Sequence, residues 1–102
     1  MAKKFSSPRI EPRIPMEVQV QISGHSEMPG VEMTFTQNVS ARGARVLTTR
    51  RWRQHDMLVV ASPAGFRSPG RVAYCEHAPG ESFAIGVEFL QPTGDWVVTP
   101  KK

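Results

Sequence analysis

The chain has 102 residues, a formal net charge of +4, 39% apolar residues and 22% charged residues. This length fits one small domain with a thin core, and the composition is that of a folded, turn-rich protein rather than a disordered one. The single cysteine, Cys75, excludes a disulfide framework within the chain and favours a cytoplasmic location. No stretch approaches the ~18 apolar residues of a membrane span, so we expect no membrane partner.

The first 15 residues are predicted to form an extended N-terminal arm. They contain three prolines, Pro8, Pro12 and Pro15, and proline is accepted neither inside a helix nor directly after a helical residue. The arm carries two arginines, Arg9 and Arg13, in the stretch PRIEPR. Because no helix can hold them, they are not an ordinary helical i,i+4 pair, and they need another explanation.

Six segments after the arm have the pattern of β-strands. Residues 16–22 (MEVQVQI) and 31–39 (VEMTFTQNV) alternate apolar and polar side chains, which is typical of half-buried strands that pair antiparallel. Further strands are predicted at residues 44–48, 57–62, 70–76 and 82–90. On one side of the second strand we expect Val31, Met33, Phe35 and Val39, and inward in the last strand Phe83, Ile85, Val87 and Phe89, with Gly86 at a close backbone approach.

This pattern predicts an all-β domain, a small barrel or sandwich of six antiparallel strands without a helix longer than one turn. We expect three parts: the arm at residues 1–15, the barrel at 16–92 and a short tail at 93–102. The C-terminal stretch QPTGDWVVTPKK, residues 91–102, contains two prolines, so a C-terminal helix is not expected.

The hexapeptide NVSARG, residues 38–43, interrupts the strand pattern. Asn and Ser side chains bond nearby backbone amides and Gly adopts positive φ, so these residues by themselves indicate a turn. From Asn38 to His55 there are five arginines and no acid. Such a run is either a solvated basic face or a site for an anion, to which the planar guanidinium presents fixed donors.

Residues that could support catalysis form no recognisable pattern. Ser40 has no histidine or carboxylate at a spacing that indicates a triad. Cys75 and His77 share a turn, but alternate residues of an extended chain point the same way without forming a catalytic pair. The other histidines lack the spacing of a metal site, and no glycine-rich phosphate loop is present. We therefore expect no enzyme, no metal and no cofactor.

The two motifs in their order, RIEPR and then NVSARG, resemble the PilZ domain family. The signature of that family is Arg-x-x-x-Arg followed by Asp/Asn-x-Ser-x-x-Gly, and the ending AIGVEFL is similar to its last barrel strand. The resemblance covers residues 9–90. It implies a six-stranded antiparallel barrel with a flexible N-terminal arm, and a ligand, the bacterial second messenger cyclic di-GMP.

The resemblance also implies roles for individual residues. Arg9 and Arg13 would bind the phosphates and guanine edges of the ligand, since guanine presents adjacent O6 and N7 acceptors that match a guanidinium. Asn38 and Ser40 would hydrogen-bond a guanine, and Gly43 would leave room for the base.

Outside the signature, Arg45 is a further candidate for a phosphate or base contact, and Arg42 a weaker one. Trp52 is expected to pack rather than to act as a stacking platform. Many members of the family carry another arginine where this chain has Pro8, which leaves open whether one ligand or an intercalated pair binds.

Three functions remain open. The first is a stand-alone cyclic di-GMP receptor that acts on an unidentified protein partner, with motility, secretion or exopolysaccharide machinery as candidates. The second is a PilZ fold that binds no nucleotide and works as a protein-interaction adaptor. The third, a basic barrel that binds RNA or single-stranded DNA, is disfavoured because stacking platforms use several exposed aromatic residues and most of the eight here are at core positions.

Overall fold

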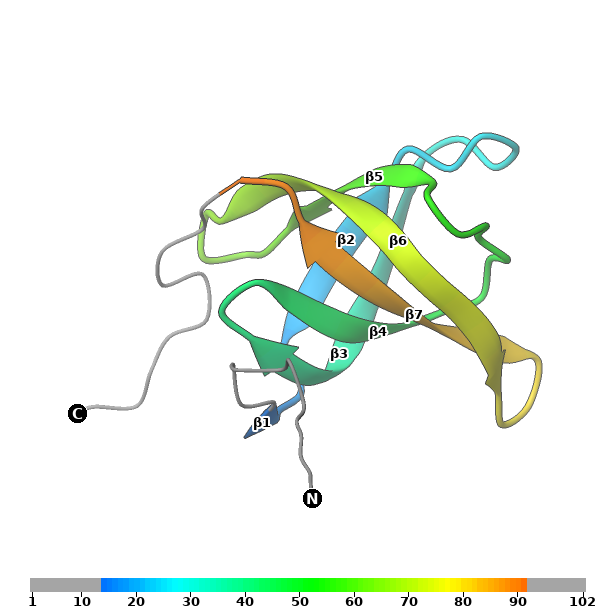
Figure 1. Ribbon diagram of the computed structural model, residues 1–102, viewed down its shortest axis with the longest axis horizontal. Helices are drawn as coiled ribbons and strands as arrows, with labels where there is room; N and C mark the ends of the chain where they lie inside the picture. Colours follow the sequence, from blue (N-terminus) through cyan, green and yellow to red (C-terminus); the bar gives the residue numbers. More distant parts are fainter. Residues whose placement is uncertain (1–13, 92–102) are drawn as a thin grey trace, which may run out of the picture.

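The computed structural model describes residues 14–91, and all regular structure in this range is β-strand (Figure 1). The strands are β1 (Ile14–Pro15), β2 (Gln19–Ser23), β3 (Val31–Ser40), β4 (Gly43–Thr48), β5 (Met57–Ala61), β6 (Arg67–Ala78) and β7 (Ser82–Phe89). The six predicted strands are confirmed as β2 to β7, with ends that differ by a few residues. The last two residues of the predicted arm form β1, whereas the rest of the arm and the predicted tail lie outside the described residues.

The strands close into an antiparallel barrel. Their order around the sheet is β3, β2, β5, β6, β7 and β4, and β4 pairs again with β3. The short strand β1 adds to β3 beside β2. Closure removes the long open edges on which sheets associate with one another, and it confirms the predicted six-stranded barrel.

Inward-facing side chains from every strand of the barrel fill its interior. Most are β-branched or aromatic, residue types that pack well on a pleated surface. The buried cluster consists of Val20, Ile22, Val39, Ala44, Val46, Trp52, Leu58, Val60, Val72, Ile85, Val87 and Phe89. The inward positions predicted for the last strand are thus confirmed at its last three sites, while Phe83 is only partly buried. Trp52 packs in the core, as predicted.

The first half of β3 faces the opposite way from Val39, contrary to the sequence prediction. A register shift between Thr36 and Asn38 marks a bulge, at which two residues of β3 oppose one residue of β4. One extra residue reverses the side to which every later side chain points. Val39, after the bulge, is buried, but three apolar residues before it are about half exposed: Val31 (55%), Met33 (55%) and Phe35 (48%).

Two polar side chains of β3 tie neighbouring segments to the barrel. The buried Thr36 hydroxyl donates to the Met16 carbonyl (2.7 Å) and accepts from the Val18 amide (2.9 Å), which fixes the segment between β1 and β2. The carboxylate of Glu32 accepts from the Thr48 hydroxyl (2.6 Å) and from the amide and hydroxyl of Thr49 (2.8 and 2.9 Å). The second tie anchors the end of β4.

Candidate functional site

The predicted hexapeptide forms the tight hairpin between β3 and β4. Ser40 pairs with Gly43, so the turn contains only Ala41 and Arg42. The buried Ser40 hydroxyl accepts a hydrogen bond from the Arg42 amide (3.3 Å), and the Arg42 carbonyl accepts one from the Phe89 amide (2.9 Å). The turn that the sequence indicated is therefore present, and Ser40 helps to shape it.

Gly43 is needed at this position because of the neighbouring strand. A Cβ atom there would come closer than 3.0 Å to the carbonyl oxygen of Val87 in β7. The expectation that this glycine adopts positive φ is wrong, because the positive-φ glycines in the described part of the chain lie elsewhere. Close packing of β4 on β7 thus explains structurally why position 43 is a glycine. Its role in leaving room for a base stays a prediction.

Strand β1 brings the beginning of the chain beside the hairpin. Ile14 pairs with Val39, and Pro15 pairs with Asn38. Arg9 and Arg13, the predicted clamp, lie outside the described residues, but Arg13 is covalently joined to Ile14. Because consecutive Cα atoms are about 3.8 Å apart, the segment that carries both arginines starts at the residues that border Asn38. The residues that directly follow the first motif therefore pair with residues of the second motif, although the two motifs are about two dozen positions apart in the sequence.

Arg45 projects from β4 on the outer side of the barrel, opposite Asn38 on β3 and Gly86 on β7. Its Nε donates to Gln37 Oε1 (2.8 Å), Nη1 to the Tyr74 hydroxyl (3.0 Å) and Nη2 to Glu76 Oε1 (3.4 Å). The hydrogen bond to Tyr74, together with smaller contributions from Glu76, outweighs the effect of burial and raises the pKa of Arg45 above its ordinary value. Arg45 therefore stays cationic beside Asn38.

The ring of Tyr74 lies against Gly86 and holds Arg45 in place. A Cβ at position 86 would come closer than 3.0 Å to three atoms of this ring, and the guanidinium carbon of Arg45 is 5.7 Å from the ring centre. The close approach predicted at Gly86 is confirmed, but it is made by a side chain rather than by backbone. Sequence reasoning missed Tyr74 and Glu76, and the only available signal was their alternation with the inward Cys75 along β6.

Further chemistry is limited in the described part of the chain. Within residues 14–91, no group of three or more His, Cys, Asp or Glu side chains is arranged to hold a metal ion. The same range contains no helix with the length and apolar character needed to cross a bilayer. Of the signature residues, the structure describes Asn38, Ser40 and Gly43, which lie at the β3–β4 hairpin next to β1 and the Arg45 network.

The described residues form a small closed antiparallel barrel with a tight β3–β4 hairpin beside β1, and comparison with known proteins identifies its class. The family model described as "PilZ domain" matches residues 7–95, and the chain belongs to this family. The fold is also similar to the solved structure of the Bacillus subtilis inhibitor of motility, MotI/DgrA. The TM-score is 0.71 and the identity 17%, and the match covers 89% of this chain and 46% of that protein. The chain thus spans less than half the length of that protein, and no curated protein matches it.

Proposed function

We propose that this chain is a cyclic di-GMP receptor domain without catalytic activity, which works in the cytoplasm by presenting a ligand-dependent surface to a protein partner. The observation that carries the proposal is the pairing of β1 with β3. Pro15, two residues after Arg13 in the sequence, pairs with Asn38 on β3. Membership of the PilZ family supports the choice of ligand.

The chemistry of the ligand suits the residues gathered there. Cyclic di-GMP carries two phosphate charges, and each guanine offers the O6 and N7 acceptors that a guanidinium matches. In the proposed complex Arg9 and Arg13 bind phosphates and guanine edges, while Asn38 and Ser40 hydrogen-bond a guanine. Arg45, which remains charged, adds positive potential at the same place. Aromatic stacking alone would not favour a doubly charged ligand over an uncharged one. In the proposed complex the three arginines supply this preference.

In this proposal, binding changes the surface by ordering the segment that carries the two arginines. Ordering of a segment on ligand binding is a common switching mechanism. The root of the segment is already fixed by the hydrogen bonds of Thr36 to Met16 and Val18, so the change is confined to the residues before it. The structural relative described as an inhibitor of motility favours the motility machinery as the partner.

Isothermal titration calorimetry with cyclic di-GMP tests the proposal. We expect micromolar or tighter binding. Because a hydrogen bond to a charged group contributes about 1.5–3 kcal/mol, Arg9→Ala and Arg13→Ala should each weaken binding roughly tenfold to a hundredfold. Arg67→Ala is the matched control, because it removes the same charge from β6, a strand that pairs with neither β3 nor β4. Absence of binding by the folded wild-type chain would exclude the proposal.

A second candidate function is a protein adaptor that binds no nucleotide. It is favoured by the structural reasons that the site already provides: Gly43 is required by β7, and Arg45 is held by Gln37, Tyr74 and Glu76. A pull-down with and without cyclic di-GMP separates the two functions. Recovery of the same partner in equal amounts under both conditions, together with no heat in the titration, would favour the adaptor.

A further inference from the structure

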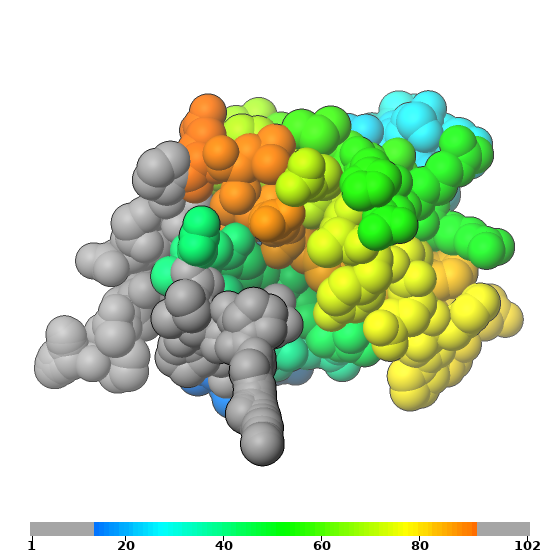
Figure 2. All heavy atoms as spheres, viewed as in Figure 1, coloured from blue at the N-terminus to red at the C-terminus, as the bar shows by residue number. Residues whose placement is uncertain are grey.

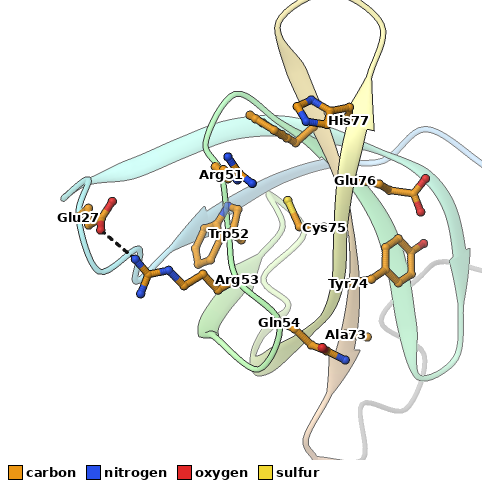
Figure 3. Close-up of a pocket in the computed structure, with 11 residues that line it drawn as sticks. Glu27, Arg51, Trp52, Arg53, Gln54, Ala73, Tyr74, Cys75, Glu76 and His77 are labelled. Atoms are coloured by element: carbon orange, nitrogen blue, oxygen red, sulfur yellow. Dashed lines mark hydrogen bonds and ion pairs between the residues drawn. The ribbon is translucent and has the colours of Figure 1, made fainter.

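A hollow of about 640 Å³ lies between the β4–β5 loop and the outer part of β6 (Figure 3). Figure 3 shows Arg51, Trp52, Arg53 and Gln54 of the loop on one side and residues 73–77 of β6 on the other. Its volume is within the range of about 300–1,000 Å³ that small-molecule pockets occupy. It contains none of the signature residues of the β3–β4 hairpin. In the space-filling view, the loop and β6 gather on the side of the molecule away from β1 (Figure 2).

The loop that forms one wall is held in a fixed shape. The amide of Arg53 donates to Asp56 Oδ2 (2.8 Å), and the amide of Asp56 donates back to the Arg53 carbonyl (3.0 Å). The amide of His55 donates to the Val72 carbonyl (2.7 Å), which ties the loop to β6. The hollow is therefore preformed, and a ligand does not have to order its wall before binding.

Trp52, which lines the hollow, carries a buried donor without an acceptor. Its side chain is 2% exposed, and its indole Nε1 has no hydrogen-bond partner among residues 14–91. Leaving such a donor unsatisfied costs about 1–3 kcal/mol, and each case in a folded protein calls for an explanation. In Figure 3 the nitrogen edge of the ring is on the side where Arg51 lies.

The charges around the hollow leave one cation uncompensated. Arg53 forms an ion pair with Glu27 (3.4 Å), and Glu76 forms one with Arg45 (3.4 Å). The guanidinium of Arg51 has neither a hydrogen bond nor an ion pair within the described range. An unpaired cation therefore stands next in sequence to the unpaired indole donor, and both residues line the hollow.

The opposite wall offers apolar surface. Cys75 of β6 packs against the core, and the ring of Phe83 lies 5.1 Å from that of His77, centre to centre. Both Cys75 and Phe83 line the hollow together with Ala73. A planar apolar group can rest on this wall while its charged end reaches the loop.

We propose that this hollow binds a small aromatic anion that carries one carboxylate or phosphate group. Arg51 neutralises the anion, the indole of Trp52 turns so that its buried Nε1 donates a hydrogen bond to it, and the aromatic part lies against Cys75 and Phe83. The site is separate from the proposed cyclic di-GMP site, although Tyr74 and Glu76 border both. It does not depend on whether the chain binds cyclic di-GMP.

Nuclear magnetic resonance of the full chain tests this site through its own donor. In a Trp96→Phe background, the remaining indole N–H signal belongs to Trp52. Titration with phenyl phosphate and with benzoate should move this signal in a saturable manner for at least one of the two probes. Benzyl alcohol, a neutral molecule of similar size, should leave it unmoved. The two anionic probes distinguish a phosphate from a carboxylate preference.

Variants in the same background decide whether Arg51 is responsible. Arg51→Gln should weaken probe binding at least about tenfold, the loss of roughly one charge-assisted hydrogen bond. Arg51→Lys should restore part of it, and Arg67→Gln should have no effect. The proposal is overturned if neither anion shifts the Trp52 signal at about 10 mM, a concentration that detects dissociation constants near 1 mM. It is equally overturned if Arg51→Gln binds the anionic probes as tightly as the chain with Arg51 does. The same holds if benzyl alcohol shifts the Trp52 signal as the anionic probes do.

Discussion

Gly43 and Gly86 lie on the paired strands β4 and β7, and both positions exclude a methyl group for different physical reasons. At Gly43 a Cβ meets the backbone carbonyl of Val87, whereas at Gly86 it meets the ring of Tyr74. Backbone within a ladder cannot move without breaking hydrogen bonds, but a partly exposed ring can rotate away. We therefore predict that Gly43→Ala destabilises the domain far more than Gly86→Ala does, although the two clashes are similarly close.

The magnitudes follow from what must move. Overpacking costs about 1–3 kcal/mol and occasionally more, and the Val87 carbonyl belongs to a ladder in which Val87 pairs with Ala44. We expect Gly43→Ala to cost about 3 kcal/mol or more, at the upper end of this range. Rotation of the Tyr74 ring loses its hydrogen bond to the charged Arg45, worth about 1.5 kcal/mol at this partly exposed site, the lower end of the range for bonds to charged groups. The lower entropy of an unfolded alanine returns about 0.4–1 kcal/mol, so Gly86→Ala should cost less than about 1 kcal/mol.

Thermal unfolding followed by circular dichroism measures both changes. In a domain of 60–100 residues, 1 kcal/mol shifts Tm by about 4–8 °C. Gly43→Ala should therefore lower Tm by more than about 12 °C, and Gly86→Ala by less than about 8 °C. A double-mutant cycle supplies the control: in a Tyr74→Ala background, Gly86→Ala should have no cost, because the atoms that it would meet are gone.

Two results would refute this reasoning. If Gly43→Ala melts within a few degrees of the wild type, the β7 backbone yields easily, and packing does not explain the glycine. If Gly86→Ala remains equally costly without the Tyr74 ring, the contact between the ring and position 86 is not the source of the effect. With a normal Tm for Gly43→Ala, the remaining explanation of this glycine would be its predicted role in leaving room for a bound base.

Four further substitutions test the barrel by urea unfolding. Glu32→Ala should cost about 1–3 kcal/mol, because it leaves the Thr48 and Thr49 donors without their acceptor; a cost near zero would show that water replaces the carboxylate. Phe35→Gln should change stability by less than about 0.5 kcal/mol because the ring is half exposed, whereas Ile85→Ala should cost about 2–5 kcal/mol; the reverse order would contradict the orientation of β3. Thr36→Val keeps the shape but removes two hydrogen bonds, so it should cost about 1–3 kcal/mol, and an unchanged midpoint would contradict this role of Thr36.

The strands were predictable because alternation of apolar and polar residues is a local property. The pattern of residues 16–22 and 82–90 places side chains on two faces without knowledge of the rest of the chain. The pattern alone left a barrel or a sandwich open, and the family resemblance supplied the six-stranded barrel. The turn at residues 38–43 was predicted from its turn chemistry.

The orientation of β3 was not predictable, because alternation shows that two faces differ but not which one is buried. Val31, Met33 and Phe35 are apolar and yet face outward, while Thr36 is buried because its hydroxyl has backbone partners 18 and 20 residues away. A bulge likewise depends on the partner strand, which a single segment does not reveal. A spacing argument that ran across the bulge therefore placed Val39 on the same face as Val31, Met33 and Phe35, although of these four residues only Val39 faces the core.

The surroundings of the candidate site were hidden for a related reason. The partners of Arg45 come from two distant strands, Gln37 from β3 and Tyr74 and Glu76 from β6, and only the closed barrel brings them together. The hollow beside Trp52 is also built from segments distant in sequence. A sequence motif identifies functional residues by their spacing along the chain. It does not identify residues that become neighbours only when the chain is folded.

The bulge in β3 has a consequence for how the outer face of the barrel is built. In a regular strand, alternate residues share a face, so one position of β4 meets a single side chain of its neighbour. The bulge sets two consecutive polar residues, Gln37 and Asn38, at the level of Arg45. The Gln37 amide restrains the guanidinium, and Asn38 pairs with Arg45 across the ladder. A single inserted residue thus brings two adjacent polar residues of β3 to one cation of β4.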